Sequence, residues 1–179
     1  KHSGLFGDAG VYSFYATKAI PAGEGGVVVS NNLRIGEKVQ KFSIYDRFDQ
    51  KLAIGNNIRI SEVQALLSFS VVREWQSIID NKIKIANQYI EKCLELNIDH
   101  INQNKNGQKG NYYKFIILSK EGDILAEMSH LQTTTSKVYD YCLGNTKVIT
   151  TNHACLPIWY GQSPDVAGKV VKELEESVR

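Results

Sequence analysis

The residue best suited to covalent chemistry is Lys18, which follows an apolar run and precedes a glycine-rich segment. The run Val11 to Tyr15 is rich in β-branched and aromatic residues, which predicts a buried strand ending before the lysine. We therefore expect Lys18 on a loop at the edge of a sheet, partly shielded from water. Burial disfavours the charged ammonium, and a neutral amine can attack a carbonyl carbon. The spacing alone leaves open the alternative of a solvated surface lysine.

The elements that must position this loop follow from the glycine and asparagine residues around it. Gly23 to Gly26 predicts a tight turn, and Gly26 to Asn31 predicts a second buried strand. Residues 32–42 predict a short helix. Residues 43–57 are polar and aromatic, which indicates a covering loop.

The strongest helix signal begins at Ser61. Ser61 and Gln64 have the spacing of a capping box, and Glu62 complements the helix dipole. Apolar residues then recur at intervals of three and four and predict one buried stripe. Its members are Val63, Leu66, Leu67, Val71, Trp75, Ile78, Ile79, Ile83, Ala86, Tyr89, Ile90 and Cys93. We expect a long helix to Leu94, with any break between Gln76 and Asn81.

The chain beyond this helix, residues 95–179, predicts a small α+β domain. Residues 1–94 would be the end of a larger domain that precedes it. The expected elements are a loop over 97–111, strands over 112–118 and 137–141, a helix over 122–131 and a loop over 154–160. A last helix should begin at Ser163-Pro164. Its expected buried residues are Val166, Val170, Val171, Leu174 and Val178.

Composition narrows the class of protein. The 179 residues are 42% hydrophobic and 22% charged, with a net charge of +2. That charge is too small to indicate binding to nucleic acid or to a membrane surface. The three cysteines and four histidines lack the spacing of a metal site, so no metal is expected. An odd number of dispersed cysteines suits the cytoplasm.

Two blocks of sequence resemble one known family. The first is Gly7-Asp8, then Tyr12-Ser13-Phe14-Tyr15-Ala16-Thr17-Lys18, then Gly23-Glu24-Gly25-Gly26-Val27-Val28-Val29. The second is Gly55-Asn56-Asn57-Ile58-Arg59-Ile60-Ser61-Glu62-Val63-Gln64-Ala65. Both are similar to segments of the DegT/DnrJ/EryC1/StrS family of sugar aminotransferases, in the same order and at a similar interval. The resemblance spans the chain but fades after about Cys93.

The resemblance implies a fold and a cofactor. The fold would be α/β, the C-terminal part of a fold-type-I, aspartate aminotransferase-like enzyme. It would comprise the end of the large-domain sheet and a small α+β domain, linked by the long helix. Residue 1 is Lys and the only methionine is Met128, so a fragment of a longer chain is expected. Such a fragment would lack half of the cofactor cup and be inactive alone.

The resemblance also implies roles for four residues. Lys18 would hold pyridoxal 5'-phosphate covalently and shuttle the proton during transamination. Ser13 would donate a hydrogen bond to the cofactor phosphate. Asn57 would reach the phosphate in the partner subunit, which makes a homodimer with shared active sites. Arg59 would bind the carboxylate of glutamate or part of the nucleotide-sugar, with an interface salt bridge as the alternative.

The implied function is amino transfer from glutamate to a nucleotide-linked keto-sugar for surface polysaccharide. Two alternatives remain at this point. A pyridoxal-dependent sugar dehydratase is disfavoured because related dehydratases carry histidine at the position of Lys18. A non-catalytic binding or dimerisation module that keeps the scaffold is the other.

Overall fold

The computed structural model describes residues 2–43, 57–119 and 152–177, and the chain divides into two compact units. Unit 1 is Lys1–Trp75 and unit 2 is Gln76–Arg179. A domain boundary after Leu94 stays a prediction. The expected elements over 122–131 and 137–141, and nearly all of the covering loop over 43–57, lie outside the described residues.

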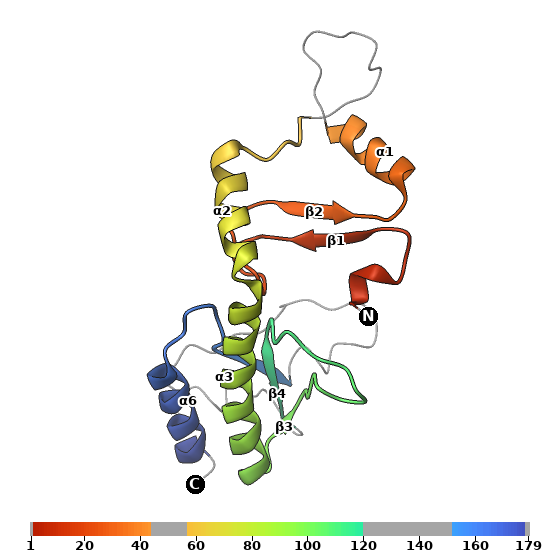
Figure 1. Cartoon of the computed structure of the whole chain (residues 1–179). Helices are drawn as coiled ribbons and strands as arrows, with labels where there is room; N and C mark the ends of the chain where they lie inside the picture. The colour runs from red at the N-terminus through yellow and green to blue at the C-terminus, as the bar shows by residue number, and fades with distance from the viewer. Residues whose placement is uncertain (1, 44–56, 120–151, 178–179) are drawn as a thin grey trace. The chain divides into compact units, whose positions relative to one another are not determined.

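Unit 1 is built on an antiparallel hairpin of β1 (Gly10–Ser13) and β2 (Gly26–Val29), in which Ser13 pairs with Gly26 (Figure 1). A single 3-10 turn, η1 (Ser3–Leu5), precedes β1, and α1 (Leu33–Ser43) follows β2. The pairing of the two predicted strands is confirmed, although both strands are shorter than expected. Their predicted burial is wrong, because Val11 is 77% exposed and Val27 and Val28 are each 40% exposed. The chain leaves the ladder after Ser13, so Phe14 and Tyr15 belong to the connection and not to the strand.

Side-chain caps fix the starts of both helices in unit 1. Asn32 Oδ1 accepts the backbone N–H of Arg34 at 3.0 Å before α1. Ser61 Oγ accepts the backbone N–H of Gln64 at 3.2 Å before α2 (Glu62–Arg73). These bonds satisfy donors that the first helical turn leaves unpaired. Both predicted helix starts are therefore confirmed.

The long helix predicted to run from Ser61 to Leu94 is two helices, because α2 ends at Arg73 and α3 (Trp75–Glu95) begins two residues later. Glu74 lies between them with φ −92° and ψ 11°, outside the helical well. The break therefore precedes the expected window of 76–81. In α2 the predicted buried stripe is wrong, since Val63 is 81% exposed and Leu66 is 68% exposed.

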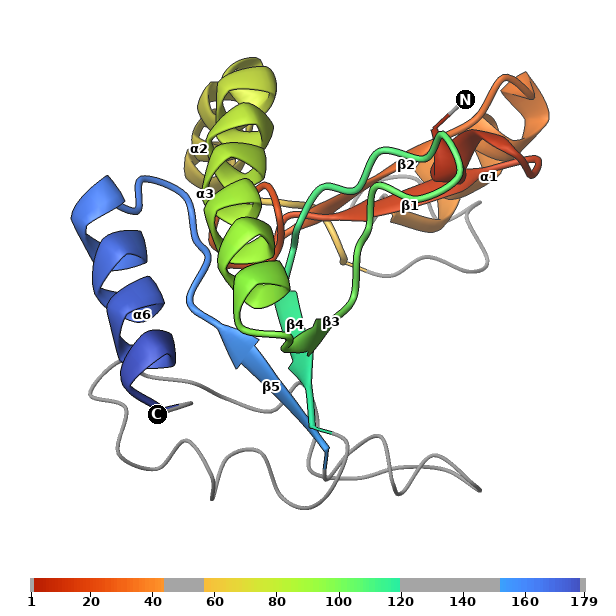
Figure 2. The same cartoon turned by 90° about the horizontal axis from the view of Figure 1, so that it is seen from below.

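In its described residues, unit 2 forms a three-stranded antiparallel sheet with two helices on one face (Figure 2). The strand order is β3 (Asp99–His100), β4 (Phe115–Leu118), β5 (His153–Leu156), and the helices are α3 and α6 (Pro164–Ser177). The loop expected over 154–160 is wrong at its start, because all four residues of β5 are buried and paired with β4. The last helix begins where Pro164 predicted.

The core of unit 2 lies between the helices and the sheet. Its most buried members are Ile85, Ala86, Tyr89, Cys93, Tyr112, Phe115, Ile117, Ala154, Leu156, Ala167, Val170 and Leu174. Val170 and Leu174 confirm the predicted face of α6, whereas Val166 and Val171 are half-buried. Val178 lies outside the described residues. Phe115 is central, since its ring lies 5.2 Å from Tyr89, 6.0 Å from His100 and 6.3 Å from Tyr112.

A buried polar network ties α3 to the segment that follows β5. Tyr89 Oη donates to the carbonyl of Pro157 at 2.8 Å and accepts Gln162 Nε2 at 3.2 Å. Gln162 Oε1 in turn accepts the backbone N–H of Trp159 at 3.1 Å. Burial raises the pKa of Tyr89 to about 12, so the phenol stays protonated and able to donate at neutral pH.

Replacing Tyr89 by phenylalanine should therefore lower the free energy of unfolding by about 1–3 kcal/mol. The ring keeps its packing, but the Pro157 carbonyl and the Gln162 amide each lose a partner in the interior. Chemical denaturation of the two proteins measures the difference. A Tyr113→Phe variant, whose ring is only half-buried, is the matched control and should change stability much less. Equal stability of Tyr89→Phe and the native chain would contradict the role given to the network.

Candidate active site

The connection between β1 and β2 carries Lys18 and is held in a defined conformation by its own backbone. Phe14 N–H donates to Gly25 O at 2.8 Å and Ala16 N–H donates to Gly23 O at 2.7 Å, which extend the hairpin beyond the strands. Ala22 N–H then turns back to Phe14 O at 2.9 Å. The glycines that end this connection have φ of +91° at Gly23 and +114° at Gly25, which favour residues without Cβ.

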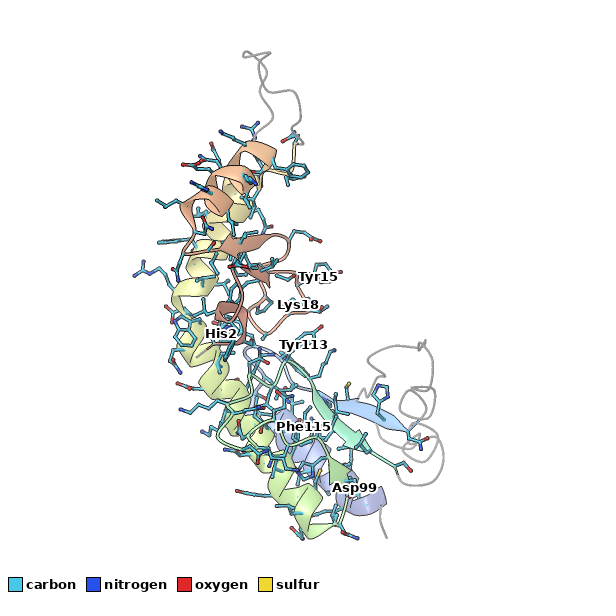
Figure 3. All side chains as sticks on the ribbon, turned by 90° about the vertical axis from the view of Figure 1, so that its right-hand side faces the viewer. His2, Tyr15, Lys18, Asp99, Tyr113 and Phe115 are labelled. Carbon is cyan, nitrogen blue, oxygen red and sulfur yellow. The ribbon has the colours of Figure 1, made fainter. Side chains whose placement is uncertain are left out.

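Lys18 lies at the tip of this connection. Its backbone N–H donates to Tyr15 O at 2.9 Å, which closes a turn immediately before it. The residue is half-buried, and Figure 3 shows its side chain together with that of Tyr15 on the same side of the loop. Lys18 thus lies on a loop that leaves the sheet, as predicted.

Ser13 is the last residue of β1, five residues before Lys18. Its side chain is exposed, and its Oγ accepts the N–H of Tyr15 at 3.3 Å. That bond uses a lone pair of the hydroxyl and not its proton. Ser13 therefore lies at the base of the lysine loop, at the end of β1.

The start of α2 docks against the lysine loop. Gln64 Nε2 donates to the carbonyl of Ala22, although the two residues are 42 positions apart. A Cβ placed on Gly23 would lie 3.3 Å from Gln64 Oε1, and one placed on Gly25 would lie 2.8 Å from Ile60 Cδ1. These contacts bring together the two sequence blocks that contain Lys18 and Asn57.

Gln64 is the residue whose role the sequence pattern missed. Its backbone takes the expected place in the capping box, but its side chain bonds to the lysine loop and not to the backbone of Ser61. The capping-box prediction is thus half wrong. Nothing in the local sequence distinguishes the two uses of a glutamine at this position, because both need the same spacing from Ser61.

Asn57 and Arg59 lie on the extended segment that enters α2 and are both exposed. Ile60, next to Arg59, provides the contact with Gly25. The segment of Asn57 and Arg59 is therefore attached to the lysine loop through its neighbours. The catalytic and binding roles of Lys18, Ser13, Asn57 and Arg59 stay predictions.

Gly25→Ala should destabilise unit 1 by about 1–3 kcal/mol, because a positive φ and the contact with Ile60 both oppose a side chain there. Gly36→Ala is the matched control. Gly36 lies within α1 with nothing within 4 Å of the added Cβ, so this change should stabilise the chain by about 0.5–1 kcal/mol. Urea denaturation measures both. Adding Ile60→Ala to Gly25→Ala should recover only the steric part of the loss, and full recovery would show that φ is not strained.

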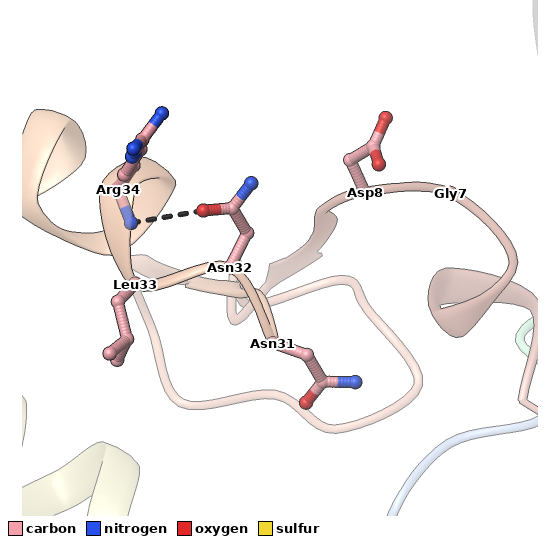
Figure 4. Close-up of a pocket in the computed structure, with 6 residues that line it drawn as sticks. All are labelled: Gly7, Asp8, Asn31, Asn32, Leu33 and Arg34. Carbon is pink, nitrogen blue, oxygen red and sulfur yellow. Dashed lines mark hydrogen bonds between the residues drawn. The ribbon is translucent and has the colours of Figure 1, made fainter.

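An open hollow of about 640 Å³ lies at the other end of the hairpin from Lys18 (Figure 4). Gly7 and Asp8 enter β1 on one side of it, and Asn31 to Arg34 leave β2 on the other. Ser30 Oγ donates to Asp8 O at 2.6 Å and holds these two segments together. The side chains that line this hollow are exposed. They come from the segment before β1 and from the start of α1, and none comes from the lysine loop.

The described residues contain neither a cluster of metal ligands nor a membrane-spanning helix. No three histidine, cysteine or acidic side chains there are grouped as metal ligands would be. In the same part of the chain no helix has the length and apolar character required to cross a bilayer.

Comparison with known proteins gives a consistent set of relatives. Residues 1–175 match the model of the DegT/DnrJ/EryC1/StrS aminotransferase family. The UDP-4-amino-4,6-dideoxy-N-acetyl-beta-L-altrosamine transaminase of Helicobacter pylori is 33% identical over 95 residues, which are 50% of this chain and 25% of the relative. The GDP-perosamine synthase of Escherichia coli O157:H7 is 30% identical over 94 residues, 50% of this chain and 26% of that enzyme.

Solved structures share the fold over nearly the whole chain. The aminotransferase TlmJ from Streptoalloteichus hindustanus superposes with a TM-score of 0.85 at 19% identity, covering 99% of this chain and 54% of that one. The Helicobacter pylori aminotransferase PseC, involved in the biosynthesis of pseudoaminic acid, gives a TM-score of 0.84 at 19% identity, with coverage of 99% and 55%. The chain thus spans about half the length of these structures. It is a mixed α/β fragment of their fold.

Proposed function

The chain belongs to the DegT/DnrJ/EryC1/StrS aminotransferase family, and on that premise we propose that it forms part of a pyridoxal 5'-phosphate-dependent enzyme. The enzyme would transfer an amino group from glutamate to a nucleotide-linked keto-sugar in the cytoplasm. The observation that carries the proposal is the docking of the Asn57–Gln64 segment onto the loop of Lys18, through Gln64 with Ala22 and Ile60 with Gly25. Two segments with the right residue types for one site are adjacent in unit 1.

The residues around the loop fit the cofactor by their chemistry. Lys18 supplies an amine for its aldehyde, and the hydroxyl of Ser13 supplies a hydrogen-bond donor for its phosphate at the base of the same loop. When bound, the cofactor supplies an electron sink that stabilises negative charge on the substrate carbon. The amine of Lys18 would take the proton from that carbon as a general base and give it up afterwards as a general acid.

The names of the relatives support the class of substrate. They include enzymes that act on UDP-, GDP- and dTDP-linked sugars, so they favour a nucleotide-sugar without choosing the base. We propose Arg59 as the group that binds the glutamate carboxylate or an anionic part of the nucleotide-sugar. Its side chain is exposed and its guanidinium fork matches a carboxylate in geometry.

A direct test uses the longest protein product that contains this chain, loaded with pyridoxal 5'-phosphate. With glutamate and a UDP- or dTDP-linked 4-keto-6-deoxy sugar, we expect formation of 2-oxoglutarate and of one equivalent of amino-sugar. Both products can be quantified by mass spectrometry. Consumption of the keto-sugar with loss of a hydroxyl group and without incorporation of nitrogen would favour the dehydratase instead. If neither amino transfer nor loss of the hydroxyl group is detected, a binding module is favoured.

A shared site can be tested by mixing two inactive variants. If Asn57 acts in the partner's site, a heterodimer of Lys18→Ala and Asn57→Ala chains contains one fully native site and one doubly altered site. Co-refolding equal amounts should then restore about a quarter of native activity, because half of the dimers are mixed and each has one working site. Activity no higher than the average of the two separate variants would contradict a site built from both subunits.

A further inference from the structure

The loop between β3 and β4 carries the only Asn-Gly pair of the sequence. Asn106 has a φ of +57° and Gly107 a φ of +77°. The backbone N–H of Gln108 donates to the carbonyl of Lys105 at 3.1 Å across this pair. Positive φ at both central residues, closed by such a bond, is the geometry of a type I′ turn. Asn106 and Gly107 are both exposed, and among the described residues nothing lies within 4 Å of a Cβ added to Gly107.

Side-chain hydrogen bonds hold the base of this loop separately from its tip. Gln103 Nε2 donates to the carbonyl of Lys114 at 2.8 Å, and Gln103 Oε1 accepts the N–H of Tyr112 at 3.1 Å. Asn104 Oδ1 accepts the N–H of Gly110 at 2.9 Å. The turn over residues 105–108 lies outside these three bonds, so it can open without breaking any of them.

The side chain of an asparagine can react with the peptide bond that follows it. The nitrogen of that peptide, once it has lost its proton, can attack the side-chain Cγ and close a five-membered ring. A side chain on the following residue hinders this approach, and glycine has none. Ring closure requires the turn to open, and an exposed turn closed by one hydrogen bond opens at little cost. Asn106 therefore combines the residue pair and the surroundings that this reaction needs.

We propose that Asn106 is a site of spontaneous deamidation through a cyclic imide, with water as the co-reactant. First, the bond from Gly107 N to Asn106 Cγ forms and the bond from Cγ to Nδ2 breaks. The Nδ2 group leaves as ammonia and takes with it the proton lost by the Gly107 nitrogen. Water then adds to one of the two imide carbonyls, and the C–N bond of that carbonyl breaks to give aspartate or isoaspartate. The inference does not depend on the proposed amino transfer.

The reaction changes both the charge and the backbone of the loop. Each event replaces a neutral carboxamide by a carboxylate, which adds a negative charge between Lys105 and Lys109 in the sequence. The isoaspartate product also adds a methylene group to the main chain inside a two-residue turn, so the bond that closes the turn should be lost. Since the bonds of Gln103 and Asn104 lie outside the turn, we expect unit 2 to stay folded.

The test is incubation of the full chain in mildly alkaline buffer, followed by ion-exchange chromatography and peptide mapping. We expect an acidic form to accumulate at a rate that rises in proportion to hydroxide, because the attacking nitrogen must lose its proton. The modified peptide should contain both aspartate and isoaspartate at position 106, which Asp-N protease distinguishes because it cleaves only before aspartate. Asn106→Gln should abolish this form, since glutamine has to close a larger ring. Asn87→Gln is the matched control, because Asn87 is an exposed asparagine within α3 that glutamine follows.

The same chain unfolded in guanidinium chloride gives the rate of the reaction without the turn. The native rate should be lower than this by less than about tenfold, because one exposed hydrogen bond shifts the opening equilibrium by no more than that. Three results would each overturn the proposal. They are a native chain that stays unmodified while the unfolded chain reacts, an acidic form that persists in Asn106→Gln, and a product at position 106 without isoaspartate.

Discussion

Lys18→Ala should lower the rate of amino transfer by about 10³-fold or more, while leaving the fold of unit 1 intact. The proposed role requires the amine twice, to hold the cofactor aldehyde and to move a proton, and proton transfer by a positioned group alone contributes about 10²–10⁴-fold. Lys18 is half-buried at the tip of a loop whose conformation is set by backbone bonds, so removing its side chain breaks none of them. The substitution should therefore separate chemistry from stability.

The measurement combines activity with a chemical label. Borohydride reduction of the cofactor-loaded native protein, followed by peptide mapping, should locate the pyridoxyl group on Lys18. Lys38→Ala removes an exposed lysine of α1 in the same unit and should change neither the label nor the rate. A small primary amine added to Lys18→Ala should restore part of the rate. Retention of label and activity in Lys18→Ala would remove this residue from the site.

The second large effect is expected at Phe115, where alanine should lower the free energy of unfolding by about 3–5 kcal/mol. The ring is fully buried and contacts aromatic side chains from α3, β3 and the segment before β4. Truncation leaves a cavity where these elements meet, and rigid neighbours fill it only in part. Since domains are stable by only about 5–15 kcal/mol, unit 2 would be close to unfolding.

Phe115→Leu keeps the measurement possible if the alanine variant does not fold, and its cost should be clearly smaller. Phe42→Ala is the control, because Phe42 is 50% exposed on α1 and its loss should change stability by less than about 0.5 kcal/mol. Denaturant titration monitored by circular dichroism compares all three. If Phe115→Ala and Phe42→Ala had the same cost, the centre of the core would lie elsewhere.

Local sequence signals predicted the parts of the fold that depend on near neighbours. The starts of α1 and α6, the cap at Ser61 and the pairing of β1 with β2 each follow from residues within a few positions. The connection between the two strands, residues 14–25, is longer than the tight turn predicted over Gly23 to Gly26. The loop position of Lys18 follows from the same signals. These elements bond mainly to themselves, so their sequence contains most of what decides them.

The failures involve partners far away in sequence. The strand β5 is short, buried on all sides and followed by Pro157, so without knowledge of β4 it resembled a loop. Gln64 was assigned to its own helix because its actual acceptor, Ala22, is 42 residues away. The apolar periodicity also predicted a buried stripe on α2, although Val63 and Leu66 are exposed in this chain. The same pattern did not predict the burial of Lys82, because lysine is not counted among the apolar residues.

The bond between Gln64 and Ala22 has a consequence for how this sequence can diverge. The acceptor is a main-chain carbonyl, which every amino acid carries, whereas the donor must be a side chain long enough to reach it. Residues in the turn beside Lys18 can therefore be exchanged in evolution without releasing that turn from α2. Position 64 has no such freedom. The size of the side chain at position 60 should covary with the presence of a side chain at position 25.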